Sequence, residues 1–194
     1  DHAAPRLGAG MKIGFDATKK IPGEEVAGMA VGADETHRPI GDAAAETILS
    51  GVSALPGVLE ATLPEELARG WLFVRIDKSA PGQGRETIER IFRMLPLDRE
   101  AGPAYVVVVG PDSDARVIDA AMFHFCAHAD ASRDAYAQAD ASGKVIRYAF
   151  DATPKLPGDE ANGQPVRPWP PILRMDDATR ALVDRRWAEY GFKG

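Results

Sequence analysis

Apolar residues run along this chain in segments of strand length, separated by Gly, Pro and Asp. Trp71-Leu-Phe-Val-Arg-Ile76, Val58 to Leu63 and Val145 to Phe150 each predict a strand, because β-branched and aromatic residues are bounded there by turn residues. From Ala104 to Val109 the chain is apolar without any alternation. That pattern predicts a central strand covered on both faces.

Two internal segments repeat their apolar residues at helical spacing. One follows Pro81-Gly82, and its apolar residues fall at i, i+3, i+4 and i+7: Ile88, Ile91, Phe92 and Leu95. The other follows the central strand, and we expect Asp112 or Asp114 to be its N-cap. Its predicted buried stripe consists of Ile118, Ala121, Met122, Phe125 and Ala129.

Two more helices are predicted nearer the ends of the chain. We expect Asp42 to be the N-cap of the first, which ends near Leu55, before a Pro-Gly turn. The last is capped by Asp176 and ends at Gly191. Its apolar side consists of Leu182, Val183, Trp187 and Tyr190.

The predicted order of elements favours an α/β fold, in which flanking helices cover a layered mixed sheet. Residues 1–41 are rich in Gly and Pro, and we expect an extended N-terminal segment there. Residues 42–153 are the expected α/β core. Residues 154–194 are the expected Pro-rich arm and terminal helix, because the prolines of the arm exclude a helix or a central strand.

Composition narrows the class of protein. A chain of 194 residues, 45% hydrophobic and 27% charged, can bury a core without disulfides or metals. Its formal net charge of −6 argues against general binding of nucleic acid. No apolar stretch is long enough to span a bilayer, and no secretory signal is visible. The single cysteine, Cys126, excludes an internal disulfide, so we expect a cytoplasmic protein.

One sequence motif occurs twice. Phe15-Asp-Ala-Thr-Lys-Lys-Ile-Pro-Gly-Glu24 returns as Phe150-Asp-Ala-Thr-Pro-Lys-Leu-Pro-Gly-Asp159. On one interpretation the motif is a turn module, in which Asp and Thr bond to local backbone and Pro-Gly makes the bend. On the other, each copy ends one fold unit, and the body of the first unit lies upstream of Asp1. Both interpretations stay open at this point.

One segment has residue types that suit an anion. Lys78-Ser-Ala-Pro-Gly-Gln-Gly-Arg85 joins a predicted strand to the start of a helix. Backbone N–H groups there, together with Lys78 and Arg85, suit a phosphate or a carboxylate. A solvated turn explains the same residues.

Few other residues suggest chemistry. His124 and His128 lie four residues apart on one predicted helix, but no further ligands at a known spacing complete a zinc site. We expect these histidines to flank the core or to lie at an interface. Nothing in the sequence lowers the pKa of Cys126, so we expect a small buried hydrophobic side chain there. No serine lies in a nucleophile elbow. We therefore predict no catalytic residue and no metal ligand in this chain.

Six segments in the same order resemble the C-terminal domain of the UbiD family of carboxy-lyases. They are Pro56-Gly-Val58 with Leu63-Pro64, Trp71 to Lys78 with Pro81-Gly-Gln83, Tyr105 to Val109 with Asp112, Asp130-Ala-Ser-Arg-Asp134, Asp151-Ala-Thr153 with Pro157-Gly158, and Arg174-Met-Asp-Asp177 through Trp187. The resemblance covers roughly residues 47–192. The chain departs from the usual family residues at Phe123, His128, Ala131 and Pro154.

The resemblance implies decarboxylation of aromatic or α,β-unsaturated acids, or the reverse carboxylation. It implies prenylated flavin mononucleotide, a divalent metal and potassium for the complete enzyme, none of them fully bound by this chain alone. The family's catalytic Glu-Arg-Glu set and metal ligands lie in a central domain that has no counterpart here. By position, Lys78 would reach toward the cofactor phosphate, with Gln83 and Arg85 as further candidates for cofactor binding.

Three functions follow as hypotheses. In the first, the chain is the C-terminal domain or a small subunit of a UbiD-like decarboxylase. It closes one side of the cofactor cleft, and its terminal helix joins it to further copies or to a catalytic UbiD-like chain. In the second, it is a non-catalytic assembly or regulatory module with the same fold, for which the departures at His128 and Pro154 are the motive. In the third, it binds a small anion or flavin phosphate at the Lys78 turn.

Overall fold

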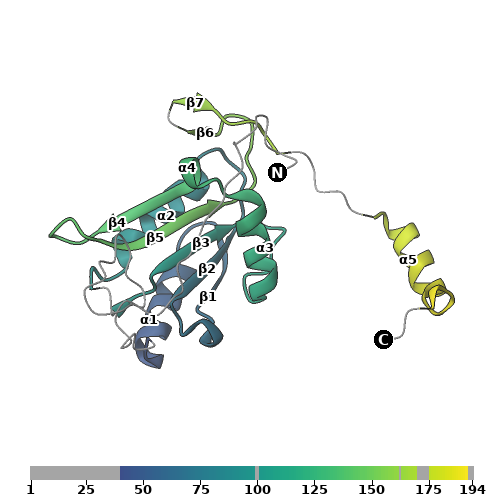
Figure 1. Ribbon diagram of the computed structural model, residues 1–194, viewed down its shortest axis with the longest axis horizontal. Helices are drawn as coiled ribbons and strands as arrows, with labels where there is room; N and C mark the ends of the chain where they lie inside the picture. Colours follow the sequence, from purple (N-terminus) through teal and green to yellow (C-terminus); the bar gives the residue numbers. More distant parts are fainter. Residues whose placement is uncertain (1–39, 99–100, 162, 170–174, 192–194) are drawn as a thin grey trace, which may run out of the picture.

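The computed structural model describes residues 40–98, 101–161, 163–169 and 175–191 (Figure 1). In chain order, its elements are α1 (Asp42–Ser53), β1 (Val58–Thr62), η1 (Glu65–Leu67), β2 (Trp71–Ile76), α2 (Gln83–Met94), β3 (Tyr105–Val109), α3 (Ile118–His128), α4 (Ala131–Asp134), β4 (Ala135–Ala139), β5 (Val145–Ala152), β6 (Glu160–Ala161), β7 (Gln164–Pro165), α5 (Asp177–Arg186) and η3 (Trp187–Tyr190). The first copy of the repeated motif lies outside the described residues.

A five-stranded mixed sheet forms the centre of the fold, in the order β1-β2-β3-β5-β4. Strands β2, β3 and β5 are parallel, and β1 and β4 pair antiparallel at the two edges. Strand β3 is the middle strand, and its residues 106–109 are fully buried. The predicted α/β class and central strand are therefore confirmed.

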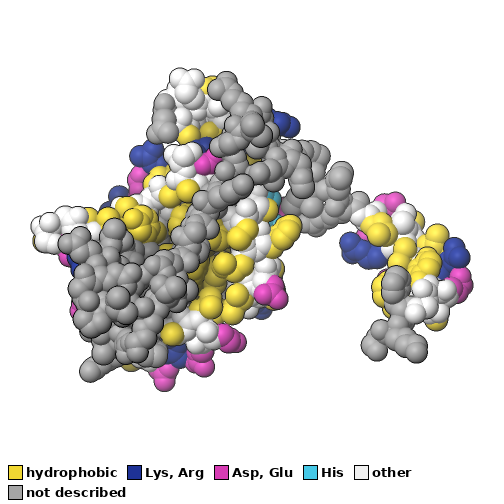
Figure 2. Space-filling model, viewed as in Figure 1, with side chains coloured by type: hydrophobic (Ala, Val, Ile, Leu, Met, Phe, Trp, Pro, Cys, Tyr) yellow, Lys and Arg dark blue, Asp and Glu magenta, His cyan; other side chains and the backbone are white. Residues whose placement is uncertain are grey.

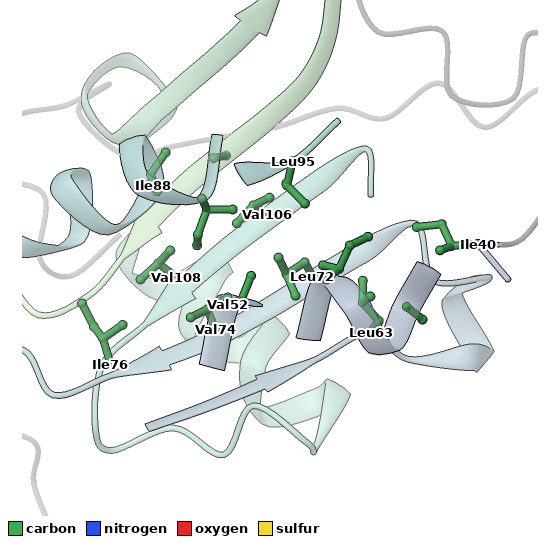
Figure 3. Packing of buried hydrophobic residues seen from close by; sticks show 14 residues of the cluster. Ile40, Val52, Leu63, Leu72, Val74, Ile76, Ile88, Leu95, Val106 and Val108 are labelled. Atoms are coloured by element: carbon green, nitrogen blue, oxygen red, sulfur yellow. The ribbon is translucent and has the colours of Figure 1, made fainter. Parts of the chain in front are cut away.

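Two hydrophobic cores lie on opposite faces of this sheet, because successive side chains of a strand point to opposite faces. Leu72 and Val74 belong to the core beneath α1 and α2, while Phe73 between them belongs to the core beneath α3. Figure 3 shows the first core, where Ile88 of α2 packs over the strand that carries Val106. The predicted helical stripe of α2 is confirmed, since Ile88, Ile91 and Leu95 are buried.

The observed N-cap of α5 agrees with the prediction, and the N-caps of α1 and α3 differ from it. Asp176 caps α5 as predicted, because its carboxylate accepts the Thr179 N–H at 2.8 Å. The N-cap of α1 is Gly41, one residue before the predicted cap at Asp42. The N-cap of α3 is Val117, so the predicted cap at Asp112 or Asp114 is wrong. A turn intervenes between β3 and α3, and within it Asp114 accepts the Arg116 N–H at 2.9 Å.

Strand β4 and the short helix α4 precede β5 and have no counterpart among the predicted elements. Strand β4 pairs antiparallel with β5, from Ala135 opposite Phe150 to Ala139 opposite Val145. Helix α3 therefore leads into an antiparallel edge strand, so the handedness rule for connections between parallel strands does not fix its side. This topology allows α3 to cover the face opposite α2.

Beyond β5 the chain leaves the sheet. Within the Pro-rich arm, β6 and β7 form a two-stranded antiparallel hairpin. Helix α5 and η3 follow, and in Figure 1 they stand clear of the sheet and its helices. Neither contains a buried residue. Within the described part of the chain, every helix is too short or too polar to cross a membrane.

Candidate functional site

Buried charged and polar side chains gather where the parallel strands end. The carboxyl ends of parallel strands meet at one edge of a sheet, which is where ligand sites form in open α/β folds. We call this group the carboxyl-edge cluster. Its members, each at most 7% exposed, are Lys78, Asp134, Asp151, Thr153, Lys155 and Asp159.

The first half of the cluster is an ion pair between Lys78 and Asp159. The Lys78 ammonium lies 3.1 and 3.2 Å from the two Asp159 oxygens and 3.3 Å from the Thr153 hydroxyl. Asp159 also accepts the N–H groups of Gly82 at 2.6 Å and Leu156 at 2.7 Å. Burial opposes ionisation of Asp159, but these hydrogen bonds and the lysine outweigh burial and lower its pKa. Asp159 thus ties the arm to the turn after β2.

The second half of the cluster centres on Lys155. Its ammonium lies 3.1 Å from Asp134 and 3.5 Å from Asp151, and it donates to the Asp151 carbonyl at 3.0 Å. Asp134 also pairs with Arg133 at 2.6 Å. One buried lysine therefore joins the start of β4 to the end of β5.

Helix α2 approaches Asp151 closely because it carries a glycine in its first turn. A Cβ atom at Gly84 would lie 2.4 Å from the Asp151 carboxylate. No side chain fits there unless that carboxylate moves, and its bond to the Thr153 N–H at 3.0 Å opposes such a move. The cluster and the N-terminal end of α2 are therefore packed as one unit.

The three predicted cofactor-binding residues lie in different surroundings. The Lys78 side chain is fully buried in the cluster. Gln83 organises its own turn, since it accepts the Ser79 N–H at 2.8 Å and donates to the Asp77 carbonyl at 2.7 Å. Arg85 is exposed and pairs with Glu89 at 2.9 Å. Cofactor binding by these residues stays a prediction.

Of the carboxyl-edge cluster, only Lys78 was among the candidate site residues predicted from the sequence. Four other members, Asp151, Thr153, Lys155 and Asp159, belong to the second copy of the repeated motif. In the second copy, Asp151 bonds to local backbone and Gly158 has φ +93°, as the turn-module interpretation requires. The acid that ends the motif does more, because Asp159 reaches Lys78, 81 positions away. Only the fold brings these two residues together.

A pair of histidines lies beside the cluster. His124 Nδ1 lies 3.2 Å from His128 Nδ1, within hydrogen-bonding distance, and the tautomers of the two rings decide which nitrogen donates. The His128 ring packs against Trp169 of the arm, with 3.8 Å between centroids and the ring planes tilted by 46°, and the Lys155 ammonium lies 5.7 Å from the centre of the same indole. Burial, then His124 and Lys155, lower the pKa of His128 to about 4. Among the described residues, no group of three His, Cys, Asp or Glu side chains could hold a metal ion.

This arrangement predicts a pH dependence of stability. In the unfolded chain His128 binds a proton near pH 6.5, whereas in the folded chain it does so only near pH 4. The free energy of unfolding should therefore fall as the pH drops between these values, by about 1–2 kcal/mol after allowing for the partial exposure of the ring. Urea unfolding across this range should show the loss. His128→Gln should flatten it, and an equally steep curve in that variant would contradict the assignment.

Cys126 is not where we expected it. The thiol is exposed, on the side of α3 that faces away from the sheet. The prediction of a buried cysteine is wrong, whereas the predicted stripe of α3 is confirmed at Ala121, Phe125 and Ala129, which are buried. Cys126 is one position beyond Phe125, so it lies outside that stripe.

Known proteins match this chain over most of its described residues. A sequence profile of the 3-octaprenyl-4-hydroxybenzoate carboxy-lyase C-terminal domain matches residues 40–159. An uncharacterised protein of Aeropyrum pernix is 28% identical over 149 residues, which is 71% of this chain and 29% of that protein.

A solved structure shows the same fold. The closed form of vanillic acid decarboxylase from Sedimentibacter hydroxybenzoicus is 11% identical, with a TM-score of 0.53 over 75% of this chain and 31% of that chain. An evolved dimeric form of the UbiD-class enzyme HmfF from Pelotomaculum thermopropionicum, in complex with prFMN, is 20% identical, with a TM-score of 0.45 over 57% of this chain and 24% of that chain. This chain thus spans less than a third of the length of each of these three proteins.

Proposed function

The chain belongs to the family of 3-octaprenyl-4-hydroxybenzoate carboxy-lyase C-terminal domains, and from this premise we propose that it is the C-terminal domain or a small subunit of a UbiD-like decarboxylase or carboxylase. The substrates would be aromatic or unsaturated carboxylic acids. The observation that carries the proposal is the extent of the profile match, which begins at the first described residue and ends at Asp159, the residue that closes the carboxyl-edge cluster.

In this proposal the chain supplies no proton-handling group. A catalytic acid needs a pKa raised toward neutral pH. Asp159 has the opposite property, because its hydrogen bonds and Lys78 lower its pKa. Asp134 and Asp151 each contact the Lys155 ammonium. The catalytic carboxylates, the divalent metal and the potassium ion would belong to a catalytic domain outside this chain.

We assign the three candidate cofactor residues different parts in closing the cofactor cleft. Lys78 already donates to Thr153 and to both oxygens of Asp159, so it does not fit as a direct phosphate ligand in this arrangement. Gln83 holds the turn through its contacts with backbone. Arg85 is the exposed member, with 65% of its side chain accessible. It would reach the phosphate of prenylated flavin mononucleotide held by the catalytic domain, while Lys78 and Gln83 position the turn.

The terminal helix would provide self-association. It carries Leu182, Trp187 and Tyr190, which are 44%, 53% and 41% exposed, and it contains no buried residue. Exposed apolar residues clustered on a tethered helix mark an interaction site.

Co-purification and truncation test this proposal. The chain should co-purify with a protein that carries the UbiD-like catalytic domain, and decarboxylation should require both. Turnover by this chain alone would contradict the assignment of the catalytic groups. Truncation after Met175 should shift the assembly to smaller species in light scattering. An unchanged mass would count against self-association through the terminal helix.

A second candidate is the non-catalytic module, favoured by the two departures from the family residues. His128 packs on Trp169, and Pro154 lies against the end of β3, where a Cβ atom at Gly110 would be 2.4 Å from its Cδ. Both residues stabilise the arm against the core. A stable homo-oligomer that captures no catalytic chain would favour this function.

The third candidate, a small binder that uses the Lys78 turn, is tested by calorimetry. The probe is flavin mononucleotide, titrated into the native chain and into Lys78→Ala and Arg85→Ala. Binding that only Arg85→Ala weakens would support a direct contact at Arg85. Equal affinities for all three chains would dismiss the turn as an anion site.

A further inference from the structure

The two histidines of α3 have no part in the proposed function. His124 and His128 are both half-exposed, and the part of the chain that the structure describes contains no other histidine. Figure 2 shows histidine atoms at the molecular surface, next to hydrophobic side chains. Residues four positions apart lie on the same side of a helix. Helix α3 therefore brings two imidazole rings together at one accessible point.

The separation of the two Nδ1 atoms suits two ligands of one zinc ion. Zinc binds imidazole nitrogen at about 2.0–2.1 Å in a tetrahedral shell, which places two ligand nitrogens about 3.3 Å apart. The Nδ1 atoms of His124 and His128 are 3.2 Å apart, and their ring planes are inclined by 67°. An ion with square-planar geometry would need about 2.9 Å between adjacent nitrogens. The observed distance thus favours zinc.

Both rings are neutral near pH 7, the form that binds a metal ion. Burial lowers the pKa of His124, and it lowers that of His128 to about 4. The charges nearby are of both signs. Asp112 acts on His124 and favours a cation there, whereas Lys155 acts on His128 and opposes one. Two aspartates lie within 3.5 Å of the Lys155 ammonium and offset its charge.

We infer that His124 and His128 bind one Zn²⁺ ion through their Nδ1 atoms. The described residues supply no group of three ligands, so water completes the tetrahedral shell. The ion replaces the contact between the two rings. A ring that carries its proton on Nδ1 takes the other tautomer, with the proton on Nε2, so the histidines release no net proton. This inference does not rest on the proposed function.

Zinc at this point would also stabilise the arm. The His128 ring packs against Trp169, with 3.8 Å between centroids, and the Trp169 N–H donates to the Lys155 carbonyl at 3.0 Å. An ion that holds His128 in one orientation also fixes the surface on which the indole packs. We therefore expect zinc to strengthen the contact between α3 and the arm.

Calorimetry tests the site directly. The probe is zinc chloride, titrated into the full chain after a chelator has removed bound metal. The native chain should bind one ion, and His124→Gln or His128→Gln should weaken binding about tenfold or more, because one protein ligand remains. Two control variants should bind as the native chain does. His2→Gln/His37→Gln removes the other two histidines of the chain, and Cys126→Ser removes its single thiol.

Three outcomes of this titration would overturn the inference. They are no binding to the native chain, equal binding by His124→Gln and His128→Gln, and loss of binding in either control variant. Long-range ¹H–¹⁵N NMR provides a check that does not depend on a substitution. With zinc bound, both rings should carry their proton on Nε2, and a signal from zinc-bound Nε2 would contradict ligation through Nδ1.

Two further measurements follow the effect of the ion on the fold. Zinc should raise the Tm of the native chain, because the pair of rings is assembled only on the folded helix, and it should not raise that of His124→Gln. Equal rises in both chains would place the ion elsewhere. Zinc should also slow hydrogen exchange of the Trp169 N–H several-fold in the native chain. Binding without slower exchange would overturn the stabilisation of the arm.

Discussion

Replacement of Lys78 by Met should destabilise the fold by about 3–5 kcal/mol, because it leaves the buried Asp159 carboxylate without its cation. The Lys78 side chain is fully buried and that of Asp159 is 8% exposed, so water cannot replace the lost ion pair. For a chain of this size such a loss corresponds to a fall of about 10 °C in Tm. Urea unfolding and calorimetry of the variant would measure it.

The control for this prediction is a second lysine. Lys144 is exposed in the turn between β4 and β5, and Lys144→Met should change the free energy of unfolding by at most about 0.5 kcal/mol. The double variant Lys78→Met/Asp159→Asn should be more stable than Lys78→Met. Its amide oxygen can still accept one of the two N–H groups, those of Gly82 and Leu156, which donate to different oxygens of Asp159, and no buried charge remains. If Lys78→Met were as stable as Lys144→Met, the ion pair would not hold the arm.

Replacement of Phe125 by Ala should lower the free energy of unfolding by about 3–5 kcal/mol, because it opens a cavity in the core beneath α3. The Phe125 side chain is 2% exposed. Its ring lies 4.7 Å from Phe150 and 6.2 Å from Trp71, between centroids. The same denaturant series would measure the loss.

Phe123, two residues earlier, is the matched control. Phe123 is 67% exposed, so Phe123→Ala should change the free energy of unfolding by at most about 0.5 kcal/mol. Equal losses of stability in the two variants would mean that the two sides of α3 had been assigned wrongly.

The elements that sequence predicted well are those with a strong local pattern. Strand β2 has the predicted bounds, from Trp71 to Ile76. Strand β3 was identified by its run of valines, and α2 by its regular stripe. In each case the side chains that decide burial lie within one element, so their spacing is enough.

Strand β4 was missed for a physical reason. Its sequence, Ala-Tyr-Ala-Gln-Ala, is poor in β-branched residues and has no strong preference for a strand. It becomes a strand because it pairs with β5 along its length, from Ala135 to Ala139. Pairing of this kind depends on the partner strand and cannot be inferred from the segment itself.

The chain alone was enough to predict its class, its central strand and its membership of a family, because these follow from short-range spacing and from motifs in a fixed order. The partners of its buried charges emerged only from the folded arrangement. Lys78 meets Asp159, and Asp134 meets Lys155, across the carboxyl edge of the sheet. The folded arrangement also showed that Cys126 lies outside the buried stripe of α3. An ion pair forms between residues that are distant along the chain and close in space, so the packing of the strands, and no local pattern, selects it.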